Sequence, residues 1–267
     1  MKNEITHLDI FTGFGGFKIA AEREGFRTIG FAEVDKDASK VLGERWPGVR
    51  NLGDVRRRDA FAGLGHVTVL TGGFTCQPWS EAGQRRGQAD DRHLWPAMRD
   101  IAALLRPTWI IGENVPGIIN LGLEFVCSDL EKLGYSTQPL AIPAGAAGAW
   151  HRRNRVWILA HLDGPGCRAG EKICPRESDA DGRDQGICAD AAGRRREGRT
   201  IQETEWRPVA PDFCGGSWRW PIESPLVRVV HGIPRRAHRI KGLGNAIVPQ
   251  IAQPFFHWIK AIEQGPG

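Results

Sequence analysis

The sequence predicts an α/β fold, a mostly parallel sheet with helices on both faces. Short apolar runs typical of buried strands alternate with segments of helical periodicity, which is the pattern of such a sheet. Polar or glycine-rich turns follow several of the apolar runs, where the carboxyl ends of parallel strands would meet. The chain has 267 residues, 41% of them hydrophobic. That suffices for one large domain, or for a domain with a small insert.

The expected elements follow one another along the chain. Strands are expected at 7–11, 28–34, 66–70, 109–111, 136–142 and 155–162. Helices are expected at 16–24, 38–46, 94–105, 123–133 and 249–263. Pro107 stops the third helix, because the residue before a proline is disfavoured in the helical conformation, and Gly134 closes the fourth. Residues 163–225 are rich in Gly, Asp, Arg, Pro and Cys with little apolar periodicity, so we expect either a loop-rich subdomain or a partly disordered segment there.

The overall charge permits an acidic partner such as DNA, because the formal net charge is +5. Basic residues gather at 85–92, 152–155 and 228–241; phosphate contacts use such clusters, although a solvated surface carries them too. The six cysteines include no CxxC pair and no Cys/His cluster of zinc type, so we expect no metal. There is no apolar run of about 18 residues and no secretory signal segment, so we expect a cytoplasmic protein without membrane contact.

A cysteine, Cys76, stands in the segment GGFTCQPWS at 72–80, beyond the expected strand 66–70. A thiol at the carboxyl end of a parallel strand, followed by a long polar loop, is well placed to act as a nucleophile. A cysteine taken at random is more often a small buried side chain that only packs. Two glycines and a proline make the backbone here irregular, and charged motifs end later strands. We therefore favour a catalytic thiol.

The first strand leads into the turn FTGFGG at 11–16, and a helix follows. Glycines let the backbone approach a ligand at a helix N-terminus, and Phe11 offers a face to an adenine ring. Glu33, after the second strand, could accept both ribose hydroxyls of an adenosine, and Asp54 could accept from an adenine amino group. Taken alone, both acids are equally well explained as surface residues. The turn departs from the GxGxxG of dinucleotide sites, which favours an S-adenosylmethionine site.

Three further polar motifs lie at expected strand or helix ends. Glu113 follows strand 109–111 and could hydrogen-bond the ring nitrogen and exocyclic amine of a heterocycle. Arg153 and Arg155 share one face of an extended segment, and their forked donors suit a carbonyl, a carboxylate or a phosphate. Asn245 precedes the last helix and could contact a ligand. Each motif also has a structural explanation: a salt-bridged edge residue, a basic surface turn and a helix cap.

In this order, the motifs resemble those of the DNA (cytosine-5)-methyltransferases, over nearly the whole chain outside 163–225. The resemblance implies a Rossmann-like, S-adenosylmethionine-dependent methyltransferase sheet built from 1–162 and 226–267, with a small target recognition region at 163–225. It implies S-adenosylmethionine as methyl donor and S-adenosylhomocysteine as product. The residues that would hold this cofactor are Phe11, Gly13, Gly15, Gly16, Glu33, Asp54, Asn245 and Ala246.

The resemblance also implies catalytic roles. Cys76 would add to C6 of a cytosine flipped out of the duplex, and Glu113 would bind the N3 and N4 edge of that base. Arg155, helped by Arg153, would address O2. The stretch 80–94 would cover the base. DNA contacts around this stretch are implied for Gln77, Ser80 and Arg92.

Two positions depart from the family pattern. Thr75 stands where the family usually has proline, and His151 where it usually has glutamine. Because threonine lacks the fixed φ of proline, we expect a less rigid loop and a slower reaction rather than a different one.

The implied function is methylation of cytosine C5 in double-stranded DNA, by a monomer that could be paired with a restriction endonuclease. A bacterial, phage or prophage origin is expected. Three other interpretations remain: a catalytically silent DNA-binding relative, a cytosine-5 methyltransferase acting on tRNA, and an NAD-dependent oxidoreductase. The GxGG turn and the Cys-Gln pair disfavour the oxidoreductase.

Overall fold

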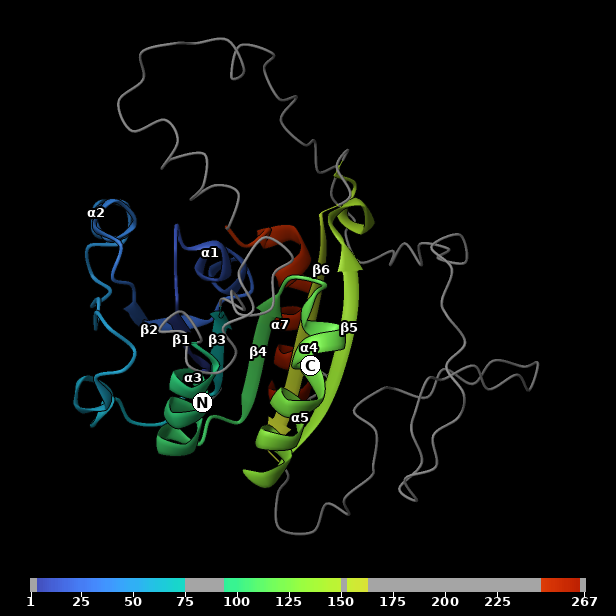
Figure 1. Cartoon of the computed structure of the whole chain (residues 1–267). Helices are drawn as coiled ribbons and strands as arrows, with labels where there is room; N and C mark the ends of the chain where they lie inside the picture. Colours follow the sequence, from blue (N-terminus) through green and yellow to red (C-terminus); the bar gives the residue numbers. More distant parts are fainter. Residues whose placement is uncertain (1–3, 75–93, 150–152, 163–245, 265–267) are drawn as a thin grey trace, which may run out of the picture.

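The computed structural model describes residues 4–74, 94–149, 153–162 and 246–264. They form a six-stranded sheet in the order β2-β1-β3-β4-β6-β5 (Figure 1). The strands are β1 Thr6–Ile10, β2 Arg27–Ala32, β3 Val69–Gly73, β4 Trp109–Asn114, β5 Tyr135–Pro143 and β6 Asn154–Leu162. Strands β2, β1, β3 and β4 run parallel, whereas β6 is antiparallel to both β4 and β5. The predicted α/β class is confirmed, with an antiparallel pair added at one end.

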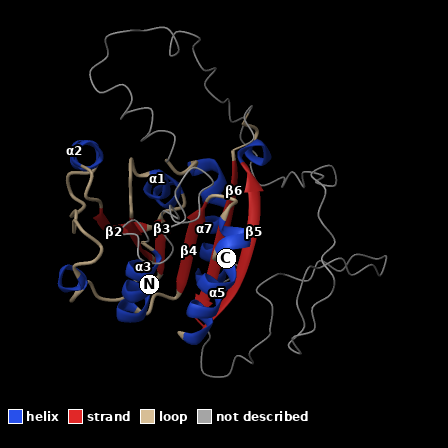
Figure 2. Ribbon diagram, viewed as in Figure 1, coloured by secondary structure: helices blue, strands red, loops and turns tan. Residues whose placement is uncertain are grey.

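Helices cover both faces of the sheet (Figure 2). One face carries α1 and α7, and the opposite face carries α3, α4 and α5, while α2 lies beyond the β2 edge. The helices are α1 Gly16–Arg23, α2 Lys36–Arg45, α3 Trp95–Leu105, α4 Ile118–Leu121, α5 Leu123–Lys132 and α7 Pro249–Gln264. Short 3-10 turns, η1 Arg58–Phe61 and η4 Ala144–Ala147, complete the described elements.

The core is divided between the two faces because successive strand residues point to opposite sides. Leu70 and Ile110 belong to the cluster under α3 and α5, whereas their neighbours Val69 and Trp109 belong to the cluster under α1 and α7. With both faces covered, these strands need mostly apolar side chains on both sides. The continuous apolar runs in the sequence have this physical cause.

The predicted strand at 66–70 is displaced. Strand β3 begins at Val69 and includes Gly72 and Gly73, which had been assigned to an irregular backbone. Gly72 pairs with Ile10 on one side and Gly112 on the other. A Cβ at Gly72 would lie 3.0 Å from a side-chain carbon of Ile10. It would also lie 3.3 Å from the sulfur of Met98 on α3, so glycine leaves room for both side chains and the strand continues through it.

Helix α2 also begins earlier than predicted, at Lys36. The side chain of Asp35 accepts hydrogen bonds from the backbone N–H groups of Asp37 and Ala38. This arrangement is an N-cap, which satisfies amides that would otherwise lack partners at the start of the helix. The capping aspartate was the overlooked sequence feature.

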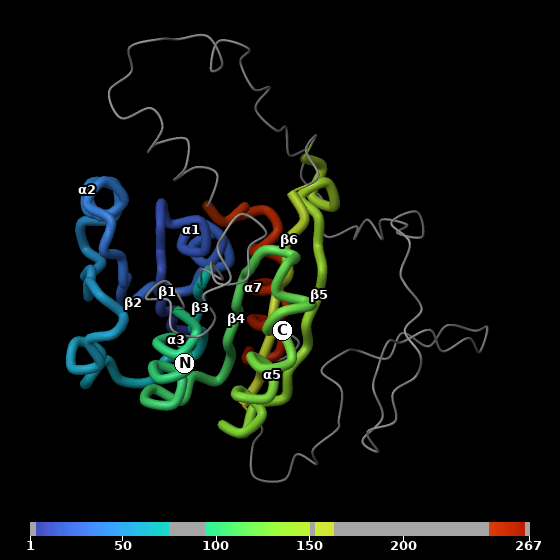
Figure 3. The backbone as a smooth tube through the Cα atoms, viewed as in Figure 1, coloured from blue at the N-terminus to red at the C-terminus, as the bar shows by residue number. Residues whose placement is uncertain are grey.

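The C-terminal helix α7 packs against α1, although the two are far apart in sequence (Figure 3). Glu24, at the end of α1, makes hydrogen bonds to two residues of α7. Its carboxylate accepts from Gln253 at 2.7 Å, and its carbonyl oxygen accepts from Lys260 at 2.8 Å. At the other end of α1, Ile247, just before α7, packs against Gly16. Residues 163–225 lie outside the described part of the chain, so the predicted target recognition region stays a prediction.

Candidate active site

Several of the expected site residues that the structure describes lie at one edge of the sheet. Because β1 to β4 are parallel, their carboxyl ends meet there. Strand β6 runs the opposite way and so begins at this edge, with Asn114 paired to Val156 and Glu113 to Trp157. The antiparallel strand thus delivers its first residues, Arg155 among them, to the end of β4.

The glycine-rich turn after β1 uses its glycines for different purposes. Gly13 has φ +55°, and a Cβ built there would meet nothing within 4 Å, so its surroundings are open. A Cβ on Gly15 would lie 2.5 Å from the Trp46 ring, and one on Gly16 would lie 2.5 Å from the carbonyl oxygen of Ile247. Gly13 therefore leaves room for a ligand, whereas Gly15 and Gly16 permit close packing. Phe11 is partly buried against the core.

Glu33 links the end of β2 to this turn. Its Oε2 accepts from the backbone N–H of Gly13 at 2.7 Å, and its Oε1 accepts from the backbone N–H of Asp35 at 2.7 Å. Each carboxylate oxygen keeps a further lone pair for another donor. The side chain is thus held in place beside the open surroundings of Gly13 and can still accept from a ligand.

An apolar residue missed by the sequence interpretation lies next to Glu33. Val34 is 66% exposed, which is unusual for an aliphatic side chain directly after a buried strand. The alternation Glu33-Val34-Asp35, with one apolar residue between two acids, is the sequence feature that could have identified it.

Asp54, the other expected cofactor acid, pairs with Arg56 in the structure. The guanidinium Nη2 of Arg56 lies 2.6 Å from Oδ2 of Asp54, and these hydrogen bonds lower the pKa of the Asp54 carboxyl. An adenine amino group would therefore have to share this carboxylate with Arg56.

A buried polar chain, also missed, runs beneath the turn. His7 bridges Thr28 and Thr71, each at 2.9 Å, and Thr71 donates to Oδ1 of Asp9 at 2.8 Å. Burial lowers the pKa of His7 to about 3, and burial raises the pKa of Asp9. Since the single hydroxyl proton of Thr71 goes to Asp9, Nε2 of His7 must be the donor to Thr71. His7 is thereby fixed as one neutral tautomer.

Glu113 and Arg155 form an ion pair at the end of β4. The Nε of Arg155 lies 2.8 Å from Oε1 of Glu113, and both side chains are largely buried. Burial raises the pKa of Glu113, while the charges of Arg155 and Arg153 oppose that shift. The other carboxylate oxygen, Oε2, lies close to Gly73, where an added Cβ would be 3.4 Å away. Glu113 therefore faces the segment that leads to Cys76.

Arg153 lies near the Glu113–Arg155 ion pair and contacts the segment before α7. Its Nη2 donates to the carbonyl oxygen of Ala246 at 2.7 Å, and burial lowers the pKa of its guanidinium. Arg153 has φ +29°, an unusual conformation for a residue with a side chain. The contact ties the start of β6 to the segment preceding α7.

The structure thus brings together two groups of predicted residues: Gly13 with Glu33, and Glu113 with Arg153, Arg155 and Ala246. The packing of Gly16 against Ile247 connects the two groups. Five predicted residues lie outside the described segments: Cys76, Gln77, Ser80, Arg92 and Asn245.

Across residues 4–74, 94–149, 153–162 and 246–264, no three acids, histidines or cysteines gather as metal ligands would. No helix in the part of the chain that the structure describes has the length and apolarity needed to span a bilayer.

The chain is similar in sequence to known DNA methylases. The family model described as C-5 cytosine-specific DNA methylase matches residues 5–190, more than half of the chain. The Type II methyltransferase M.HgiBI of Herpetosiphon aurantiacus is 36% identical over 160 residues, which cover 57% of this chain and 36% of that protein. The Type II methyltransferase M.NgoMIV of Neisseria gonorrhoeae is 32% identical over 164 residues, covering 59% and 52% respectively. The matched region thus spans roughly a third to a half of these relatives' own length.

A solved structure has a similar fold. The structure of DNMT2 from Spodoptera frugiperda superposes with a TM-score of 0.53 at 17% identity, covering 64% of this chain and 54% of that one. At this identity the likeness concerns the fold alone, and it supports the Rossmann-like arrangement of the sheet.

Proposed function

Because the chain belongs to the C-5 cytosine-specific DNA methylase family, we propose that it transfers a methyl group from S-adenosylmethionine to C5 of cytosine in double-stranded DNA. One observation carries the proposal: the buried Glu113–Arg155 pair lies beside Gly73, three residues before Cys76. Covalent activation of a cytosine ring requires a thiol together with a carboxyl group and a guanidinium, and the last two lie beside the segment that leads to Cys76.

Cys76 is the proposed nucleophile. Its thiolate forms a bond to C6 of the cytosine, the C5–C6 π electrons move to C5, and C5 becomes able to attack a methyl group. After transfer, the C5 proton leaves to a base, the bond between sulfur and C6 breaks, and the double bond returns. When bound, S-adenosylmethionine supplies the electrophilic methyl carbon. The thiolate form is favoured by neighbouring positive charge, and Arg155 and Arg153 are the proposed sources.

Glu113 is the proposed group at N3 of the base. Negative charge that develops on the ring when sulfur adds to C6 is relieved by a proton or hydrogen bond at N3. Since burial raises the pKa of Glu113, its carboxyl holds a proton at higher pH than an exposed glutamate does, which suits a donor. Arg155 keeps the carboxyl oriented and, with Arg153, is proposed to donate to O2.

The residues present fit the cofactor. The open surroundings of Gly13 leave space at the N-terminus of α1, and the carboxylate of Glu33 is already held there by two backbone amides. Glu33 is proposed to accept from the ribose hydroxyls, and Asp54 from the adenine amino group. The full proposed set is Phe11, Gly13, Gly15, Gly16, Glu33, Asp54, Asn245 and Ala246.

DNA is the proposed substrate, and the base must leave the stack before Cys76 can reach it. Gln77, Ser80 and Arg92 are proposed to contact the DNA, and residues 163–225 to select the target sequence. The relatives named as Type II methyltransferases support a role in restriction–modification. We therefore propose a monomer that acts alongside a restriction endonuclease.

The test is a methyl-transfer assay with tritiated S-adenosylmethionine. Mixed-sequence DNA and tRNA serve as alternative acceptors, and bisulfite sequencing identifies the modified base and its context. Wild-type protein should label DNA at C5 of cytosine, and Cys76→Ser should label nothing while it still binds cofactor and DNA. Label in tRNA alone, or none in either acceptor, would overturn the proposal. Full activity of the serine variant would refute the role of Cys76.

A further inference from the structure

Two buried aromatic side chains lie on either side of residues 75–93 in the sequence and touch in the structure. Phe74 directly follows β3, and Trp95 is the first residue of α3. Their ring centroids are 5.2 Å apart with the planes inclined by 50°, and the two residues are only 2% and 1% exposed. The described residues on either side of 75–93 are therefore held together at one place in the core.

Phe74 is held from the β4 side. Its carbonyl oxygen accepts from Nδ2 of Asn114 at 2.9 Å, in a buried hydrogen bond. Its ring lies against Gly112, where an added Cβ would be 3.1 Å from a ring carbon. Any side chain at residue 112 would displace the ring, so the glycine sets the depth at which Phe74 is seated.

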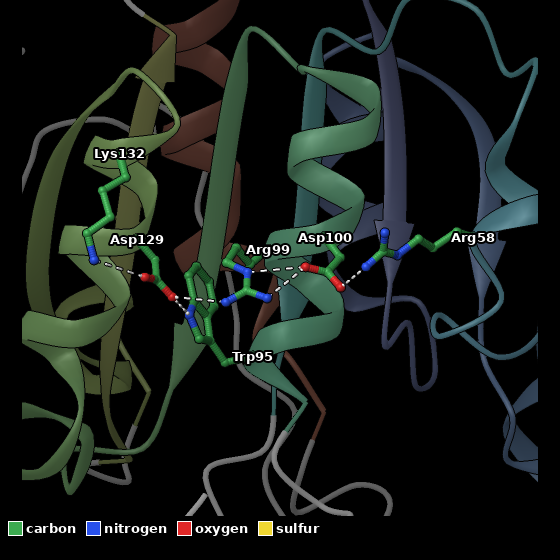
Figure 4. A network of polar contacts seen from close by, with 6 residues as sticks. All are labelled: Arg58, Trp95, Arg99, Asp100, Asp129 and Lys132. Carbon is green, nitrogen blue, oxygen red and sulfur yellow. Dashed lines mark hydrogen bonds and ion pairs between the residues drawn. The ribbon is translucent and has the colours of Figure 1, made fainter.

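Trp95 is held from the α5 side. Its indole N–H donates to Oδ2 of Asp129 at 3.1 Å, in a buried contact (Figure 4). The Asp129 carboxylate also lies 3.6 Å from Arg99 and 3.6 Å from Lys132. Beyond Arg99, the ion pairs continue to Asp100 and from there to Arg58, the first residue of η1. One polar network thus joins α5, α3 and η1 around the indole.

Packing alone does not account for this arrangement. Burying a carboxylate costs free energy unless it is paired and hydrogen-bonded, and an apolar residue at 129 would fill the space at lower cost. An indole N–H, in turn, needs a partner when the ring is buried. The Trp95–Asp129 hydrogen bond gives the ring one orientation, which apolar contact with Phe74 would not specify.

We propose that Trp95 and Asp129 are positioning residues for catalysis by Cys76. The hydrogen bond fixes the indole against Phe74, and Phe74 fixes the backbone two residues before the thiol. A displacement of about 1 Å at a reacting group can cost about 100-fold in rate. Because Asp129 sits on α5, well outside the reacting groups, its effect on the reaction would pass through Trp95 and Phe74. The inference rests on the proposed function, in which Cys76 adds to cytosine C6.

The experiment measures how fast the full chain forms a covalent crosslink with DNA that contains 5-fluorocytosine. Trp95→Phe keeps a ring but removes the donor, and Asp129→Leu removes the acceptor while keeping the number and branching of the side-chain heavy atoms. Both should slow the crosslink roughly 10-fold or more, with the cofactor dissociation constant unchanged. Asp100→Asn is the matched control, because it removes charge from the same network without touching Trp95, and its rate should stay within about twofold of wild type.

A double variant separates positioning from loss of structure. If both residues act through their shared hydrogen bond, Trp95→Phe combined with Asp129→Leu should be no slower than the worse single variant. Crosslinking of Trp95→Phe at the wild-type rate would overturn the inference. The inference would also be overturned if Trp95→Phe or Asp129→Leu lost cofactor affinity by the same factor as crosslinking rate, while Asp100→Asn lowered Tm by as much as they do. Failure of the wild-type chain to crosslink at all would count against the proposed function itself.

Discussion

Arg155 on β6 and Glu113 on β4 meet at 2.8 Å across an antiparallel pairing, with side chains only 19% and 11% exposed. A pair this buried is costly to break from one side, because the remaining charge is left without a partner. It also holds the carboxyl group in a single orientation beside the segment that leads to Cys76. Neutralising the carboxyl should therefore change both chemistry and stability.

Glu113→Gln should slow methyl transfer by roughly 100-fold or more, because the amide cannot give a proton to N3. The rate is measured in a single turnover with saturating cofactor and DNA. Glu124→Gln, on the adjoining helix α5, is the control for loss of a carboxylate outside the site. A Glu113→Gln rate equal to that of wild type would show that the carboxyl takes no part in the reaction.

Glu33→Gln should weaken cofactor binding about 10-fold, which corresponds to about 1.4 kcal/mol. An amide offers one acceptor oxygen where the carboxylate offers two, so one of the contacts to Gly13 and Asp35 is lost together with acceptance from the ribose. The dissociation constant is measured by calorimetry with S-adenosylhomocysteine. Glu44→Gln on α2 is the control, since its side chain is exposed and pairs only with Lys40 among the contacts found. Equal affinities for wild type and Glu33→Gln would remove Glu33 from the cofactor site.

Alanine at Gly13 and at Gly16 should have different consequences. At Gly13 the new Cβ meets no neighbour, but φ +55° is strained for alanine by about 1–2 kcal/mol, and the methyl group intrudes on the open space proposed for the ligand. At Gly16 the new Cβ would collide with the backbone of Ile247, so the segment before α7 must move, at about 1–3 kcal/mol.

Cofactor affinity and the urea midpoint of unfolding together separate the two variants. Gly13→Ala should lose affinity out of proportion to its loss of stability, and Gly16→Ala should lose stability at least as strongly as affinity. A Gly13→Ala variant that is less stable but binds the cofactor as tightly as wild type would contradict the proposed use of the turn.

Stability should fall as the pH drops below about 6.5, and His7 should be one cause. Its pKa is about 3 in the folded protein, against 6.5 for an ordinary histidine. Below pH 6.5 the unfolded chain takes up a proton at this residue while the native state does not, so stability is lost progressively toward pH 3. The full effect of one such group is about 3–5 kcal/mol.

His7→Gln should therefore be less stable than wild type at pH 8 but lose less stability on acidification. Urea midpoints at pH 8, 6, 5 and 4 provide the measurement, with the exposed His66→Gln as the matched control. Parallel pH curves for wild type and His7→Gln would show that the buried histidine does not contribute to acid sensitivity.

Much of the fold could be predicted from the sequence, because alternating apolar and helical segments are local patterns. The four parallel strands and five of the helices lie within a few residues of their expected positions. The errors have local physical causes. Strand β3 continues through Gly72 because a glycine leaves room for the side chains of Ile10 and Met98, and α2 starts early because Asp35 caps it.

The candidate site was predictable as a set of motifs but not as an arrangement. That polar residues follow apolar strands is readable from the positions of Gly13, Glu33 and Glu113 along the chain. The antiparallel direction of β6 beside β4, which faces Arg155 toward Glu113, is seen only in the folded chain. The same holds for the return of α7 to α1 and for the contact between Ala246 and Arg153.

The hydrogen bond between the buried side chains of Trp95 and Asp129 could likewise not be predicted from the sequence. The physical reason is that local periodicity reports which face of an element is apolar, whereas the partner of that face depends on packing between distant segments. Such contacts become favourable only after the whole chain has been folded around them.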